Sequence, residues 1–174
     1  MTGQIARRPW FRAALAALCM SLGCEHRQAL AVDLRELCAK LPCRQVRGSG
    51  PPLPYVNGDV VTIYEGESFA VTGTPKGDEL ADLRFAAPDE KGPVIKLTFE
   101  IHEGHSFLML SNGFDRMVKY SAQMVVGDDP RPQATSTCPI IPLGGAFERW
   151  AQPLKVIFLA RFHFLNPAGG FVCD

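Results

Sequence analysis

Apolar and polar residues alternate along several stretches of the chain, and this two-residue period constrains the fold more than any other feature. Along residues 95–102 every second side chain is apolar and the ones between are mostly polar. That pattern predicts a strand with one buried and one solvated face. The Glu-Gly-His segment at 103–105 predicts a turn, and the apolar run at 106–110 predicts the returning strand of a hairpin.

Further strands are expected wherever β-branched and apolar residues recur between turn residues. The last stretch, 154–164, places Leu154, Val156, Phe158, Ala160, Phe162 and Phe164 at alternate positions, so we expect one uninterrupted apolar face there. A loop is expected at 73–78 and a single helical turn at 146–152. The remaining predicted strands are 60–64, 68–72, 83–87, 118–126 and 134–138.

About eight short strands without intervening helices indicate an all-β fold. We expect an immunoglobulin-like antiparallel β-sandwich over residues 55–174. A small β-barrel is the alternative, because alternation alone does not reveal whether a sheet closes. Residues 32–54 are expected to form a short helix, ending at Pro42, and a connector rich in Pro and Gly.

The first residues have the pattern of an export signal. Arg7, Arg8 and Arg12 precede an uncharged apolar run at 13–23, which Glu25 follows directly. The run is too short for a transmembrane helix, which needs about 20 apolar residues. The sequence therefore predicts a periplasmic or secreted protein.

Two processing routes are compatible with this signal. Ala29-Leu30-Ala31 has the small-x-small pattern of a signal peptidase site and predicts a signal peptide over 1–31. Alternatively, residues 21–24 resemble a bacterial lipobox, which would make 1–23 a lipoprotein signal and Cys24 the lipid acceptor of a membrane-anchored protein. Because Ser21 stands where lipoproteins usually carry Leu, the soluble product is favoured.

Cys38, Cys43, Cys138 and Cys173 remain outside the signal on either route. An even number of cysteines in an exported chain favours disulfides. Of the three connectivities we prefer Cys38 with Cys43 and Cys138 with Cys173. A metal site or redox pair built on these cysteines is disfavoured, since no Cys-x-x-Cys is present.

Two segments in the C-terminal half resemble uncharacterised exported proteobacterial proteins. They are residues 110–120 (Leu-Ser-Asn-Gly-Phe-Asp-Arg-Met-Val-Lys-Tyr) and the stretch from Thr-Cys-Pro at 137–139 to Phe-Glu-Arg-Trp at 147–150. The resemblance implies a small periplasmic protein rich in β-structure. It implies no activity.

Charge and motifs argue against several functional classes. The 18 basic and 18 acidic residues cancel, so nucleic acid is not an expected partner, and contact with a membrane is expected only through a lipid anchor. No Gly-x-Ser-x-Gly elbow or phosphate-binding loop is present, so we assign no catalytic residue and expect no cofactor.

Two small groups of residues are candidates for function. His102 and His105 lie three residues apart, and His163 or Asp115 could complete a metal site with them; solvated turn histidines are the simpler interpretation. Phe147, Arg149 and Trp150 have the composition of a binding hot spot, although Trp150 could instead fill the end of the core.

The leading functional hypothesis is a non-catalytic binding or assembly module of the cell envelope, with a protein, peptide or glycan as its partner. A small metal-dependent or serine hydrolase is the second hypothesis. A structural accessory domain is the third.

Overall fold

A computed structural model describes residues 34–45, 52–166 and 170–173 of the chain. The predicted signal over 1–31, the alternative signal over 1–23 and the candidate lipid acceptor Cys24 lie outside the described residues. In the described part no helix is long and apolar enough to cross a membrane.

The described chain consists of one short helix followed by strands, which confirms the all-β prediction with a short N-terminal helix. Nearly all strands belong to one antiparallel system, and only the two-residue pair β1 and β2 stands apart. The elements are α1 (Leu34–Cys38), β1 (Cys43–Arg44), β2 (Leu53–Pro54), β3 (Val56–Asn57), β4 (Val60–Tyr64), β5 (Ser68–Lys76), β6 (Glu79–Phe85), β7 (Ile95–His102), β8 (His105–Asn112), β9 (Val118–Val126), β10 (Gln133–Thr135), β11 (Gly145–Trp150) and β12 (Leu154–Phe164).

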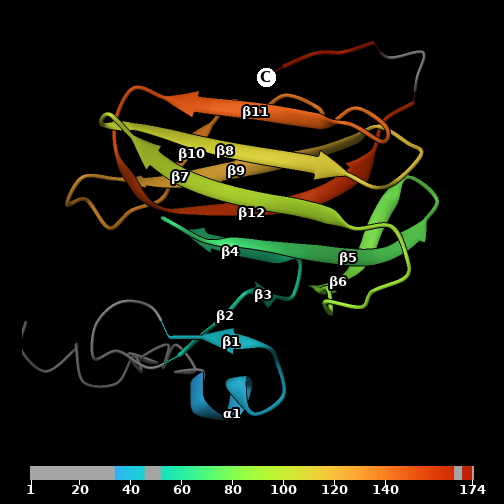
Figure 1. Cartoon of the computed structure of the whole chain (residues 1–174), viewed down its shortest axis with the longest axis horizontal. Helices are drawn as coiled ribbons and strands as arrows, with labels where there is room; N and C mark the ends of the chain where they lie inside the picture. Colours follow the sequence, from blue (N-terminus) through green and yellow to red (C-terminus); the bar gives the residue numbers. More distant parts are fainter. Residues whose placement is uncertain (1–33, 46–51, 167–169, 174) are drawn as a thin grey trace, which may run out of the picture. The chain divides into compact units, whose positions relative to one another are not determined.

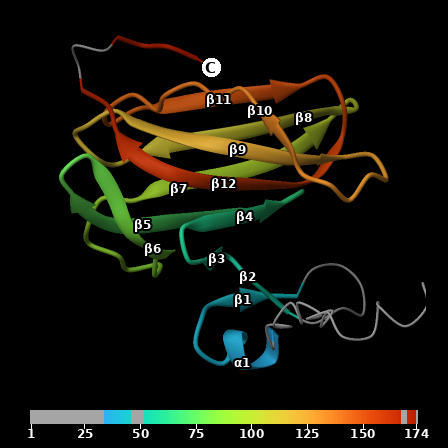
Figure 2. The same cartoon turned by 180° about the vertical axis from the view of Figure 1, so that it is seen from behind.

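The main sheet folds over into two layers. Its strand order is β10-β9-β12-β6-β5-β7-β8-β11, with β4 added to β12 and β3 added to β4. Strands β7, β8 and β11 form the layer nearest the viewer in Figure 1, and β9, β10 and β12 form the layer nearest the viewer in Figure 2. Because β10 and β11 end the order without pairing to each other, the sheet is a sandwich and not the alternative closed barrel. An immunoglobulin-like connectivity stays a prediction.

The hairpin at 95–112 follows the predicted register. Ile95, Leu97 and Phe99 are fully buried, and their polar neighbours point outward. His102 pairs with His105, so the turn has two residues, and both have a positive φ, 50° for Glu103 and 77° for Gly104. This is the mirror-image turn geometry that matches the twist of a two-residue hairpin.

Strand β5 continues to Lys76, so the loop prediction was wrong for residues 73–76; Gly77 and Asp78 form the turn to β6. The first half of β5 pairs with β7 and the second half with β6, with a register shift between Thr72 and Thr74. A Cβ on Gly73 would lie 2.7 Å from the carbonyl oxygen of Ala81. Gly73 therefore permits the close approach at which β5 passes from one layer to the other.

Strand β12 contradicts the prediction of one uninterrupted apolar face. Two register shifts against β9 interrupt its alternation, between Leu154 and Ile157 and again between Ala160 and His163. As a result Ile157 and Leu159 are fully buried, whereas Phe158 is only half-buried. Each bulge inserts one residue and exchanges the two faces of the strand beyond it, and a period count from sequence does not reveal this.

The segment predicted as a helical turn at 146–152 is largely strand. Residues of β11 pair antiparallel with β8 at six consecutive positions, from Gly145 with Ser111 to Trp150 with Ser106. Six residues with a weak local pattern take the conformation that their neighbouring strand imposes, because tertiary pairing outweighs propensity in so short a segment.

Both predicted disulfides are present. Cys38 is bonded to Cys43 after α1, and Cys138 is bonded to Cys173, which ties the C-terminal residues 170–173 to the chain after β10. The N-terminal part, α1 to β2, is joined to the sandwich by Arg44. Its guanidinium hydrogen-bonds to the Glu67 carboxylate and to the carbonyl of Thr62.

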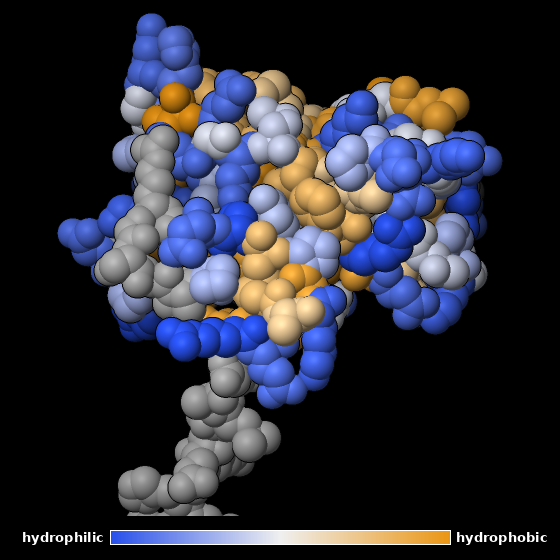
Figure 3. All heavy atoms as spheres, turned by 60° about the horizontal axis from the view of Figure 1, so that its bottom comes forward, coloured by the Kyte–Doolittle hydropathy of each residue, from blue (hydrophilic) through white to orange (hydrophobic). Residues whose placement is uncertain are grey.

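A patch of half-buried aromatic side chains lies where this N-terminal part meets β5 and β6. The ring of Tyr55 contacts those of Phe69 and Phe85 at centroid distances of 4.8 and 4.6 Å. Figure 3 shows apolar residues gathered in a band across the face that carries the lower strands of Figure 1.

Candidate ligand-binding groove

The four candidate metal ligands do not converge. His102 and His105 face each other at the tip of the β7–β8 hairpin, and this tip lies near the start of β12, where the Leu154 amide donates to Ser106 Oγ (2.8 Å). His163 lies nine residues farther along β12, which corresponds to roughly 30 Å of strand. Asp115 lies in the loop between β8 and β9.

The described chain contains no group of three or more His, Cys, Asp or Glu side chains that could hold a metal ion. The predicted set of His102, His105, His163 and Asp115 is thus not assembled as a site. The reason is geometric, because the two hairpin histidines and His163 belong to opposite ends of the sandwich.

The three residues predicted as a binding hot spot are divided between two faces of β11. Phe147 and Arg149 point outward, with Phe147 56% exposed and its ring 5.5 Å from that of Phe107. Trp150 points inward, packs against the core and donates from Nε1 to Thr135 Oγ1 (2.9 Å). The structure therefore does not present the three side chains on one surface, and Trp150 links the two layers of the sandwich.

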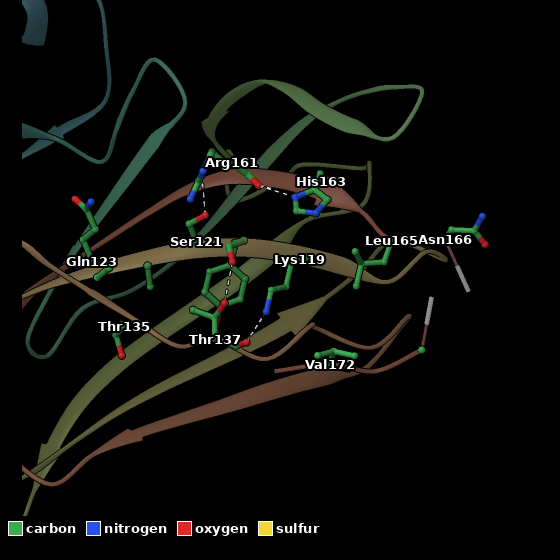
Figure 4. A pocket seen from close by; sticks show the side chains of 14 residues that line it. Lys119, Ser121, Gln123, Thr135, Thr137, Arg161, His163, Leu165, Asn166 and Val172 are labelled. Carbon is green, nitrogen blue, oxygen red and sulfur yellow. Dashed lines mark hydrogen bonds between the residues drawn. The ribbon is translucent and has the colours of Figure 1, made fainter. Parts of the chain in front are cut away.

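A groove of about 740 Å³ lies on the outer face of β9 and β12. Its walls are part of β10, the segment that follows it and the C-terminal residues 170–173. Figure 4 shows Ser121, Arg161 and His163 on one side of the hollow and Thr137 and Val172 on the other. The polar side chains that line it include Lys119, Ser121, Gln123, Thr135, Arg161 and His163.

The second bulge of β12 brings Arg161 to this groove. Arg161 has a φ of 55°, in the left-handed region that side chains other than Gly rarely adopt. Without the inserted residue the alternation after Ala160 would turn position 161 toward the core. Instead Arg161 is exposed, and its Nε donates to Ser121 Oγ on the neighbouring strand (2.8 Å).

The same bulge orients His163. Its Nδ1 lies 2.9 Å from the carbonyl oxygen of Arg161. A carbonyl oxygen only accepts, so Nδ1 carries the proton of this hydrogen bond. The other ring nitrogen, Nε2, then has a lone pair in the neutral ring and a proton in the charged ring. His163 can therefore accept from a neutral ligand or donate to an acidic one.

Buried hydrogen bonds hold the opposite wall in place. Lys119 Nζ donates to the carbonyl of Thr137, and the Thr137 hydroxyl donates to the carbonyl of Tyr120 (2.8 Å). The next residue, Cys138, donates from its amide to Glu148 Oε1 (2.6 Å), and Tyr120 donates its hydroxyl to the same oxygen (3.1 Å). Burial and the nearby Glu148 carboxylate raise the pKa of Tyr120, so this phenol stays protonated and remains a donor.

Most arginines in the described part of the chain pair with a carboxylate, but Arg161 does not. Within that part, the hydrogen bond to Ser121 is the only one that its side chain makes. In addition, no Asp or Glu occurs among the described residues that line the groove. The paired arginines are Arg44 with Glu67, Arg84 with Glu90, Arg116 with Asp78 and Arg131 with Asp129.

The polar side chains of the groove are hydrogen-bonding groups: hydroxyl, amide, guanidinium, ammonium and imidazole. The Ser121 hydroxyl is held by a guanidinium and not by a general base, so it is not arranged as an activated nucleophile. Sequence reasoning missed this site. The alternating Lys119, Ser121 and Gln123 on β9 were a visible signal, but the bulge that adds Arg161 and His163 to the same face was not.

Comparisons of the chain with protein-family models, with curated proteins and with solved structures found no match. The resemblance of residues 110–120 and 137–150 to exported proteobacterial proteins therefore stays a prediction.

Proposed function

We propose that this protein is a non-catalytic peptide-binding module of the cell envelope and that the groove on β9 and β12 is its binding site. The observation that carries the proposal is the position of an edge strand beside the groove. Ala134 and Thr135 of β10 line it, and in the described chain β10 pairs with β9 on one side only.

An edge strand next to a polar groove suits an extended peptide. The free side of β10 offers backbone donors and acceptors to a strand added alongside it. Alternate side chains of that peptide would point into the groove, where Ser121, Gln123 and Thr135 provide hydrogen-bonding partners. Backbone pairing supplies affinity in this mode of recognition, and the groove supplies selectivity.

A peptide fits this lining better than a sugar ring. Sugars are commonly held on the flat face of an exposed aromatic ring, whereas Tyr120, the one Phe, Tyr or Trp among the described lining residues, is 1% exposed. The hydroxyl, amide, guanidinium and imidazole groups of the groove match the donors and acceptors of a peptide.

The two disulfides support placement of this module in an oxidising compartment. Disulfides persist outside the cytoplasm and are rare inside it. Cys138–Cys173 has a direct part in the site, because it retains the C-terminal residues of which Val172 lines the groove. We include the cell envelope in the proposal because it is an oxidising compartment of this kind.

The test is selection of octapeptides displayed on phage against the oxidised full chain, followed by NMR titration with the selected peptides after synthesis. We expect the amide shifts to concentrate on β9, β10 and the end of β12. Gln123→Trp should fill the groove and weaken binding at least about 10-fold, because Gln123 is exposed on the same face. Ser111→Trp is the matched control, since Ser111 is an exposed polar residue on the outer face of β8.

Three outcomes would overturn the proposal. One is the absence of any selected peptide that binds in solution. Another is a set of shifts centred on Phe147 and Arg149 instead of the groove. The third is that the chain binds neutral oligosaccharides and does not bind peptides, which would assign the groove to glycans.

A further inference from the structure

We infer that the groove selects peptides through a carboxylate, which the Arg161 guanidinium and the His163 ring hold in place. This inference rests on the proposed function, since it names the chemical group that the peptide must present. It depends on Arg161 and His163 and on the bulge that places them together.

Arg161 brings a positive charge into the groove. Four other arginines each form an ion pair with a nearby carboxylate. The Arg161 guanidinium forms none in the described part of the chain. A guanidinium offers five N–H donors in a rigid fork. One of them is used by Ser121, so the terminal nitrogens are left to receive an oxygen pair.

The backbone of Arg161 is left-handed, with a φ of 55°. A left-handed conformation is unfavourable for Arg, and Gly would adopt it without strain. Residues held in rarely populated backbone conformations cluster at binding and catalytic sites. Arg161 is in addition oriented by Ser121, which reduces the rotamer freedom that a ligand would otherwise have to remove.

The side chains around Arg161 also favour an anionic ligand. His163 follows Arg161 by two residues, shares its face of β12 and can present Nε2–H to an anion when it is protonated. Ser121 and Gln123 add neutral donors. No carboxylate of the described lining competes for these groups, so the groove is complementary to a ligand carboxylate.

Three synthetic peptides test the inference by calorimetric titration against the full, oxidised chain. The first is acetyl-Ser-Val-Asp-Val-Ser-amide, the second replaces its Asp by Asn, and the third is the Asn peptide with a free C-terminal carboxylate. We expect the Asp peptide to bind about 10-fold more tightly than its Asn isostere, as charge-assisted pairs with Arg are stronger than neutral ones. The third peptide distinguishes a terminal carboxylate from a side-chain carboxylate as the group recognised.

Matched variants locate the preference. Arg161→Gln should abolish the difference between the Asp and Asn peptides, and Arg161→Lys should reduce it, because Lys keeps the charge without the fork. Arg149→Gln is the charge-matched control, since Arg149 lies exposed on β11, away from the groove. Arg161→Gly should lose the preference while unfolding at the same or a higher urea concentration, because Gly relieves the backbone strain.

The results separate the two proposals. Equal binding of all three peptides would overturn the carboxylate anchor and leave the peptide-binding function intact. The anchor would also be overturned if Arg149→Gln lost the preference for the Asp peptide while Arg161→Gln kept it. If none of the three peptides binds at millimolar concentration, both the anchor and the function are wrong.

Discussion

Arg44 offers the sharpest test of how the N-terminal part is held to the sandwich. Its side chain is 8% exposed and that of Glu67 is 19% exposed. Arg44 Nε donates to Glu67 Oε1 (2.9 Å), and its Nη2 donates to Glu67 Oε2 (3.3 Å) and to the carbonyl of Thr62 (2.8 Å). The guanidinium also lies 4.5 Å from the ring centroid of Tyr55.

Replacement of Arg44 by Met removes all of these interactions at once and leaves the Glu67 carboxylate half-buried without its cation. Loss of one partner from a buried ion pair costs about 3–5 kcal/mol. Glu67 keeps a hydrogen bond from the Tyr64 amide (2.8 Å) and some contact with water, which favours the lower end of that range. We therefore expect a loss of about 3 kcal/mol, which corresponds to a fall in Tm of about 6–12 °C in a domain of this size.

Urea unfolding followed by circular dichroism measures this loss through the shift in midpoint at constant m-value. Lys155→Met is the control. Lys155 and Asp128 form an ion pair (3.5 Å) with both side chains largely exposed, so its loss should change the free energy of unfolding by no more than about 1 kcal/mol.

A double-mutant cycle completes the experiment. Glu67→Gln in the Arg44→Met background should cost less than it does alone, by about 1–2 kcal/mol, because the two side chains stabilise each other. The reasoning is refuted if Arg44→Met costs no more than Lys155→Met. Strict additivity of the two substitutions would equally show that the pair is not coupled.

Three further predictions concern the sandwich. Gly145→Ala should lower the free energy of unfolding by about 1–3 kcal/mol in urea titrations, because its Cβ would lie 2.7 Å from a carbonyl oxygen of β8; Gly92→Ala, whose Cβ would meet its nearest atom at 3.7 Å, should not. Because the pKa of Tyr120 is raised, the folded chain retains the phenol proton above about pH 10, where the unfolded chain loses it. The free energy of unfolding should therefore fall above that pH by up to about 1.4 kcal/mol per pH unit. Tyr120→Phe should flatten that fall, and an unchanged alkaline slope would contradict the assignment. Serine at both Cys138 and Cys173 should cost about 4 kcal/mol, from the loop entropy of their 35-residue separation, and a loss under about 1 kcal/mol would contradict this estimate.

Local periodicity and covalent chemistry were sufficient for a large part of this fold. The alternation in 95–102 predicted the hairpin and its buried face, because a strand pairs with its immediate neighbour through a short turn. The two disulfides were predicted because an even set of cysteines in an exported chain favours pairing, and the short Cys38–Cys43 spacing favoured one connectivity.

Features that depend on a distant partner were not accessible in this way. Strand β11 has a weak pattern of its own and becomes a strand only by pairing with β8. Register also decided how the predicted hot spot is arranged, since Phe147 and Arg149 share a face that Trp150 does not. The separation of His102 and His105 from His163 is likewise a matter of which ends of the sandwich they occupy.

The sequence by itself determined that this chain builds an all-β fold, and it predicted the two disulfides. The tertiary structure alone decided that the sheet does not close into a barrel and which side chains line the groove. Bulges in β12 exchange the faces of the strand, and the one before His163 places Arg161 and His163 on the side of β9 that carries Ser121. The physical reason is that the period of two is a local property of the backbone, whereas a bulge is set by the pairing of strands far apart in the chain.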